Sequence, residues 1–234
     1  MTTVILTFAP SILILSYFIL NDKFKEPIGS IILIFFLGFL ICLPAGILNG
    51  LSDDFFLKKL NYSEDLTVSF LGPAWAEELL KFGILYFIVV NRNEFNEPMD
   101  GLVYGVTVSL GFATYENYTY VYEWAVAIAK EENFSTEAFS YLVALGRSYS
   151  AIPMHGFNGA VMGYYFGMYA FTGNKNYLAL SLALPYLFHG FYNYLLFPNS
   201  MVIIVILVIF SLYLHNDLKK KQKLKKEEKE QIQI

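Results

Sequence analysis

The chain repeats one pattern seven times: a long stretch in which apolar side chains dominate, followed by a short polar segment. A transmembrane helix needs about 20 predominantly apolar residues, and each stretch approaches that length. The sequence therefore predicts an all-α membrane protein, a bundle of about seven transmembrane helices. The expected spans are residues 4–20, 28–51, 66–90, 101–129, 151–172, 177–197 and 200–215.

The amino-acid composition agrees with a membrane protein. Hydrophobic residues make up 56% of the 234 residues and charged residues only 15%, whereas soluble domains average about 45–50% and about 25%. This excludes a disordered chain, a nucleic-acid-binding domain and most soluble domains, so no nucleic-acid partner is expected. Cys42 is the only cysteine, which excludes a disulfide framework and a thiolate zinc cluster.

The spans form one transmembrane domain, predicted for residues 1–217. Its functional core is expected at about residues 66–197, because the third to sixth spans carry the polar residues. Residues 135–150 mix apolar residues with Glu137 and Arg147, which is typical of an interfacial helix, of an extension of the fifth span, or of an eighth helix.

Residues 218–234 form a lysine-rich tail. Seven of the 16 lysines and arginines lie between Lys219 and Lys229. The positive-inside rule places this tail in the cytoplasm and, with seven spans, the amino terminus outside. The sequence therefore predicts a multi-pass protein of the cell membrane, with the lipid bilayer as its constant partner.

Ionisable side chains interrupt the third to sixth spans. A charge at mid-bilayer costs about 2.5–3.5 kcal/mol on insertion scales, so such residues are functional candidates. Glu77, Glu78 and Lys81 lie on one face of the third span. Counting the helical rise from the span ends places the candidates between the midplane and the outer face, so we predict one site there. The candidates in the other three spans are Glu116, Asn117, His155, Asn158, His189 and Asn193.

Glycines recur at intervals of four residues in two of these spans. Gly101 and Gly105 lie in the fourth span, and Gly159, Gly163 and Gly167 lie in the fifth. Small residues at this spacing let two helix backbones pack closely. We therefore expect these two spans to be in close contact.

The order of the polar motifs resembles the PrsW family of intramembrane proteases, which is distantly related to the membrane-embedded CAAX-prenyl-protein endopeptidases. The matching motifs are Glu77-Glu78-x-x-Lys81, Phe112-x-x-x-Glu116-Asn117, His155 near the start of a helix, and His189-x-x-x-Asn193. The resemblance implies cleavage of a single-span membrane protein, in some members an anti-sigma factor cut on its extracytoplasmic side. It also implies that the paired glutamates act in catalysis and that His155 is the essential histidine.

Peptide hydrolysis needs a base that activates water, a group that stabilises the oxyanion, and an acid for the leaving amine. The base is Glu77 or Glu78, and the sequence does not choose between them; Lys81 keeps the other carboxylate ionised. Glu116, His155 and His189 complete the predicted catalytic set. The predicted supporting residues are Lys81, Asn117, Asn158 and Asn193, although Asn158 and Asn193 are more typical of interhelical hydrogen bonds.

A metal-dependent and a metal-free mechanism are both compatible with these residues. In the first, His155, His189 and one glutamate, Glu78, bind zinc and leave a fourth position open for water. In the second, the histidines and Asn117 or Asn193 hold the water and the oxyanion directly. The metal-free version is slightly preferred, because a zinc site should show more redundancy of ligand types.

Two other classes of protein also bury ionisable residues in a membrane. A proton- or cation-coupled transporter uses buried carboxylates and histidines as relays, but it would be expected to show inverted repeats, and none is visible. A bis-histidine haem protein would use His155 and His189 as axial ligands. Haem ligation does not require the neighbouring carboxylates, so the sequence favours the protease.

Overall fold

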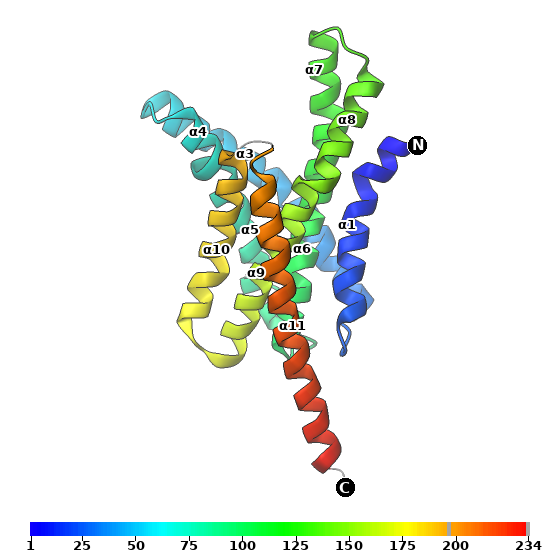
Figure 1. Cartoon of the computed structure of the whole chain (residues 1–234). Coiled ribbons are helices and arrows are strands. Elements are labelled where there is room, and N and C mark those ends of the chain that lie inside the picture. The colour runs from blue at the N-terminus through cyan, green and yellow to red at the C-terminus, as the bar shows by residue number, and fades with distance from the viewer. Residues whose placement is uncertain (196–197, 233–234) are drawn as a thin grey trace.

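Figure 1 shows the computed structural model, which describes residues 1–195 and 198–232 and, for residues 225–232, the backbone alone. Every regular element in these ranges is helical, which confirms the predicted all-α class. The elements are α1 (Thr2–Asn21), α2 (Ile28–Leu40), α3 (Cys42–Ser52), η1 (Asp53–Lys59), α4 (Glu64–Leu66), η2 (Thr67–Ala74), α5 (Trp75–Phe87), η3 (Val89–Asn91), α6 (Pro98–Thr119), η4 (Tyr120–Trp124), α7 (Ala125–Glu131), α8 (Thr136–Tyr149), α9 (Ala151–Thr172), α10 (Lys175–Tyr194) and α11 (Met201–Ile232).

Each predicted span coincides with helix over most of its length. Residues 196 and 197, at the end of the sixth span, and residues 233 and 234 of the tail lie outside the described residues. Three helical stretches, Thr2–Asn21, Ile28–Lys59 and Met201–Leu224, are long and apolar enough to cross a membrane by length and composition alone. Helices α6, α9 and α10 are of similar length but carry the polar residues singled out above.

Helix α6 forms the centre of the bundle. Every residue from Met99 to Thr114 is buried, as expected for a helix that is covered on all sides. Its neighbours include α2, α9 and α1. Because Glu116 follows this buried segment by less than one turn, the central helix sets the position of that carboxylate.

The predicted glycine contact between the fourth and fifth spans is confirmed. Helices α6 and α9 run in opposite directions, so that Gly101 lies against Gly167 and Gly163, and Gly105 lies against Gly163 and Gly159. A Cβ atom at Gly163 would overlap the carbonyl oxygen of Gly101. The two backbones are therefore in direct contact, with no room for side chains between them.

Replacing Gly163 by alanine should destabilise the protein. The added methyl group has no space, and overpacking of this kind costs about 1–3 kcal/mol. Thermal unfolding in detergent measures the effect. Gly83→Ala is the matched control, because a Cβ there meets only Cδ2 of the Phe87 ring, at 4.0 Å. Equal melting temperatures for the two variants would contradict the packing argument.

The beginning of the lysine-rich tail is packed against the bundle. The side-chain nitrogen of Gln222 donates a 2.8 Å hydrogen bond to Oδ1 of Asp22, in the loop between α1 and α2, and a second bond to Glu97. Gln222 is buried. Burial also raises the pKa of Asp22 above its ordinary value, because desolvation disfavours the charged carboxylate.

Helices α7 and α8 form a hairpin at the opposite end of the bundle from the tail, and its tip extends beyond the start of α1 (Figure 1). Residues 135–150, for which the sequence left three interpretations, form the separate helix α8. The chain breaks at Ser150, where φ is −118° and ψ is −81°, and then enters α9. The hairpin therefore leads directly into the helix that carries His155.

Candidate active site

A cavity of about 530 Å³ lies among α3, α5, α6, α9 and α10. Helix α3 supplies small and apolar residues to its wall, among them Cys42 and Gly46. The opposite wall is polar and comes from elements far apart in the sequence. Its ionisable and amide side chains are Glu77, Glu116, Arg147, His155, His189 and Asn193.

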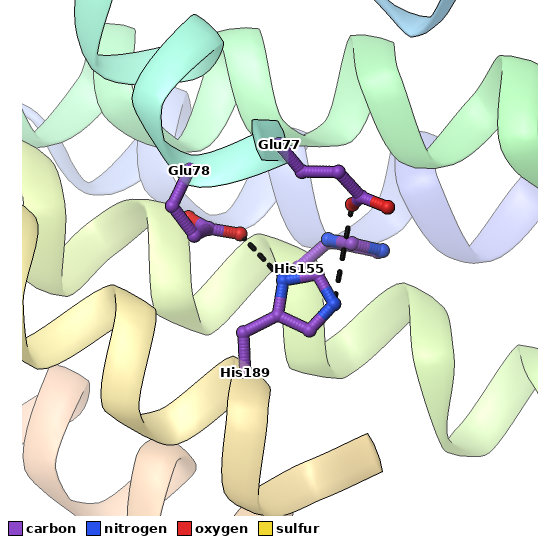
Figure 2. A group of neighbouring side chains, drawn as sticks. All are labelled: Glu77, Glu78, His155 and His189. Carbon is purple, nitrogen blue, oxygen red and sulfur yellow. Dashed lines mark hydrogen bonds and ion pairs between the residues drawn. The ribbon is translucent and has the colours of Figure 1, made fainter. Parts of the chain in front are cut away.

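Two glutamates and two histidines meet at one point of this wall. Glu77 and Glu78 come from α5, His155 from α9 and His189 from α10 (Figure 2). Each offers one ligand atom, and these atoms all lie within 4.8 Å of one another. His189 is 2.8 Å from Oε1 of Glu78 through Nδ1 and 3.9 Å from Oε2 of Glu77 through Nε2. The structure thus brings together four residues that the sequence predicted as catalytic.

Lys81 provides a buried positive charge for the two carboxylates. Its Nζ is 2.8 Å from Oε1 of Glu78 and 3.5 Å from Oε2 of Glu77, and it lies 4.2 Å from the centre of the Phe112 ring. The same nitrogen is 3.0 Å from Nδ1 of His155. Because an ammonium group can only donate, Nδ1 accepts this bond and the proton of a neutral His155 is on Nε2.

Glu116 orients His155 from the other side. Its Oε2 is 3.0 Å from Nε2 of His155, the nitrogen that carries the proton, so the histidine donates and the carboxylate accepts. Carboxylate partners of this kind fix the tautomer and the ring orientation of a functional histidine. Glu116 therefore positions His155, and it lies outside the group of four that could share a metal.

Arg147 belongs to the site, although the sequence did not identify it as a site residue. Its Nη2 donates a 2.6 Å bond to Oε2 of Glu116, and its Nε donates a 2.8 Å bond to Oδ1 of Asn117. The guanidinium also lies 4.0 Å from the centre of the Tyr120 ring. Two features of the sequence could have identified it. Arg147 lies just before the helix of His155, and the Glu116 carboxylate had no cationic partner assigned to it.

The three asparagines differ in their positions. Asn193 lines the cavity, whereas Asn158 donates a 3.0 Å bond to the carbonyl oxygen of Pro185 and so links α9 to α10. Asn117 donates a 2.8 Å bond to the carbonyl oxygen of Thr7. Asn117 and Asn158 therefore hold helices together, and Asn193 is the one of these three that lines the cavity.

The fold and the site together describe a membrane-embedded hydrolase with a buried carboxylate and histidine centre. Residues 26–215 match the model of the PrsW family, described as intramembrane metalloproteases. The chain is 33% identical to the Protease PrsW of Geobacillus kaustophilus over 82% of this chain and 78% of the relative. It is 35% identical to the Protease PrsW of Bacillus subtilis over 80% and 79%, and 30% identical to that of Clostridioides difficile over 83% and 79%.

The chain belongs to the PrsW family. It is an intramembrane protease, which answers the choice between protease, transporter and haem protein. No solved structure matches the chain.

Proposed function

We propose that Glu77, Glu78, His155 and His189 form the catalytic centre of this protease and that Glu77 is the general base. The observation that supports this most directly is the convergence of these four groups, from three helices, within 4.8 Å of one another. A group of this kind is expensive to bury in a membrane unless it serves a function.

The lining of the cavity supports Glu77, and not Glu78, as the base. Glu77 lines it, whereas Glu78 does not and is bound on one oxygen by both Lys81 and His189. A base must reach the water that it deprotonates. Glu77 therefore takes the proton from water and passes it to the leaving amine, and the side-chain amide of Asn193 and the guanidinium of Arg147 face the cavity where the oxyanion forms.

We further propose that the centre holds a zinc ion. The ligands would be His155, His189 and Glu78, a three-ligand set with one open position. Oε2 of Glu78 is buried and has no hydrogen-bond partner among the described residues, as expected for an atom reserved for a ligand. Zinc, when bound, would polarise the substrate carbonyl and increase the acidity of water.

The charge of the site also favours a bound cation. Three carboxylates, the buried Glu77 and Glu78 and the partly buried Glu116, face two cationic side chains, Lys81 and Arg147. With neutral histidines the group has an excess of negative charge, which is costly to bury without a further cation or a proton. Lys81 contacts Nδ1 of His155, so its ammonium group and a metal ion compete for that nitrogen.

The proposed substrate is a single-span membrane protein, such as an anti-sigma factor, cut in the outer half of the cell membrane. Membership of the PrsW family supports a membrane-embedded protein substrate. The lysine-rich tail supports a cytoplasmic carboxy terminus. With that orientation the α7–α8 hairpin, at the other end of the bundle, would lie on the outer side.

Metal content and metal removal test the zinc site. Purified protein should contain close to one zinc per chain, chelation should abolish cleavage of a single-span substrate in vesicles, and added zinc should restore it. His189→Ala should lose the metal. His215→Leu is the control, because the ring nitrogens of this third histidine are buried and unpartnered among the described residues, away from the site. Full cleavage by chelated, zinc-free protein would refute the zinc site but leave the role of Glu77 open to its own test.

A further inference from the structure

A second hollow, of about 300 Å³, lies between η4 and α8, at the base of the α7–α8 hairpin and beside the active-site cavity. It is at the small end of the size range of ligand pockets. Its wall is mostly apolar, and three of its side chains, Trp124, Leu142 and Tyr149, are 48%, 59% and 45% exposed. We refer to this hollow as the hairpin groove. It is lined by Tyr120, Trp124, Leu142, Val143, Gly146 and Tyr149, with Arg147 and Ser150 as its polar members.

The hairpin groove adjoins the active-site cavity. Tyr120 and Arg147 line both hollows. Arg147 bonds to Glu116 at 2.6 Å, and Glu116 bonds to His155 at 3.0 Å. An extended peptide advances about 3.3–3.6 Å per residue, so about two residues reach from the histidine to Arg147.

The shape and chemistry of the groove fit a polypeptide better than a lipid chain. At its junction with the cavity, the Arg147 guanidinium lies on the Tyr120 ring, and these polar groups can bond to a peptide backbone. Because Glu116 already neutralises Arg147, the arginine is less suited to bind an anionic lipid headgroup. Beyond this polar junction the wall is apolar, so it offers burial to one large side chain. A substrate chain in the cavity would meet the groove at Tyr120 and Arg147, which line both hollows.

We propose that the hairpin groove is a specificity subsite that binds a large apolar side chain of the substrate, two or three residues from the cleaved bond on the extramembrane side. This inference rests on the proposed catalytic centre. The groove decides which sequence next to a transmembrane helix is cut, whereas the centre performs the hydrolysis.

A peptide series tests the subsite. The probes are single-span peptides in lipid vesicles that carry alanine or phenylalanine at one of four consecutive positions on the extramembrane side of the cleaved bond. The wild type should prefer phenylalanine at one position by about tenfold or more in kcat/KM, the order that apolar pockets achieve. Gly146→Trp, which fills the groove at a position where a Cβ meets nothing within 4 Å, should reduce this preference to less than about twofold.

Two further variants make the result specific. Leu142→Glu puts a carboxylate on the exposed wall of the groove and should shift the preferred residue from phenylalanine to lysine at the same position. Gly29→Trp is the matched control, since Gly29 also has no neighbour within 4 Å and lies at the start of α2; it should keep the wild-type preference.

The outcomes separate the subsite from the catalytic centre. The wild type should cleave the alanine peptides and Glu77→Gln should not. This comparison tests the catalytic centre independently of the groove. The subsite is refuted if the wild type shows no preference at any position, or if Gly146→Trp retains the preference; the groove would then be a lipid-facing surface. Failure of the wild type to cut any peptide would refute both.

Discussion

Replacing Glu77 by glutamine should lower kcat for substrate cleavage by about 10²- to 10⁴-fold, the range that a general base contributes. Glutamine has nearly the shape of glutamate but cannot accept the proton of water at the cavity wall. Because zinc is assigned to His155, His189 and Glu78, the variant should keep its metal. Single-turnover cleavage and elemental analysis of the same preparation measure both properties.

Glu78→Gln provides the contrast. Glu78 does not line the cavity, and it bonds to Lys81 and His189. Because it is assigned as a zinc ligand, the variant should lose both zinc and activity. Glu64→Gln, an exposed residue of α4, should change neither. The roles assigned to the two glutamates would be wrong if Glu77→Gln cleaved at the wild-type rate. They would also be wrong if Glu78→Gln lost activity but kept its metal.

Replacing Lys81 by methionine should destabilise the protein by about 3–5 kcal/mol, the cost of removing one partner of a buried ion pair. The variant would leave Glu77 and Glu78 without their shared ammonium group, and its apolar side chain cannot replace the bonds of 2.8 Å and 3.5 Å. Chemical unfolding in detergent, with chelator in both samples so that metal content is equal, measures the free energy of unfolding.

Lys58→Met is the matched control for this measurement. Lys58 also pairs with an acidic residue, Asp54, four positions earlier, and the contact is shorter, at 2.6 Å. Both side chains are exposed, so water and salt screen their attraction. The free energy of unfolding should stay close to that of the wild type. Similar losses for the two variants would mean that burial is not the source of the Lys81 effect.

The membrane fold and most of the site could be predicted because both leave local signals. Long apolar stretches predict spans wherever they occur, and a glutamate pair such as Glu77 and Glu78 is conspicuous inside one. Helical rise was sufficient to predict that His155 and His189 belong to one site, and their side chains do converge. The glycine spacing correctly predicted that α6 and α9 are in contact.

Other parts of the site depend on long-range geometry. Arg147 reaches Glu116 only because α8 folds back along η4, which continues from the end of α6, and no periodic pattern specifies that return. The choice between Glu77 and Glu78 depends on how α5 is rotated about its axis, which two adjacent residues cannot indicate. Asn158 fitted two interpretations, and its bond to Pro185 supports the structural one.

The glycine contact between α6 and α9 has a mechanical consequence for catalysis. Where two backbones are in direct contact, no side chain lies between them that could change its rotamer and so change the distance between the helices. That distance therefore has a single value. Further along the same two helices, Glu116 of α6 and His155 of α9 are joined by the 3.0 Å hydrogen bond. The glycine contact therefore fixes the spacing of the two helices that carry Glu116 and His155. The length of the hydrogen bond between these side chains depends on residues that have no side chains themselves.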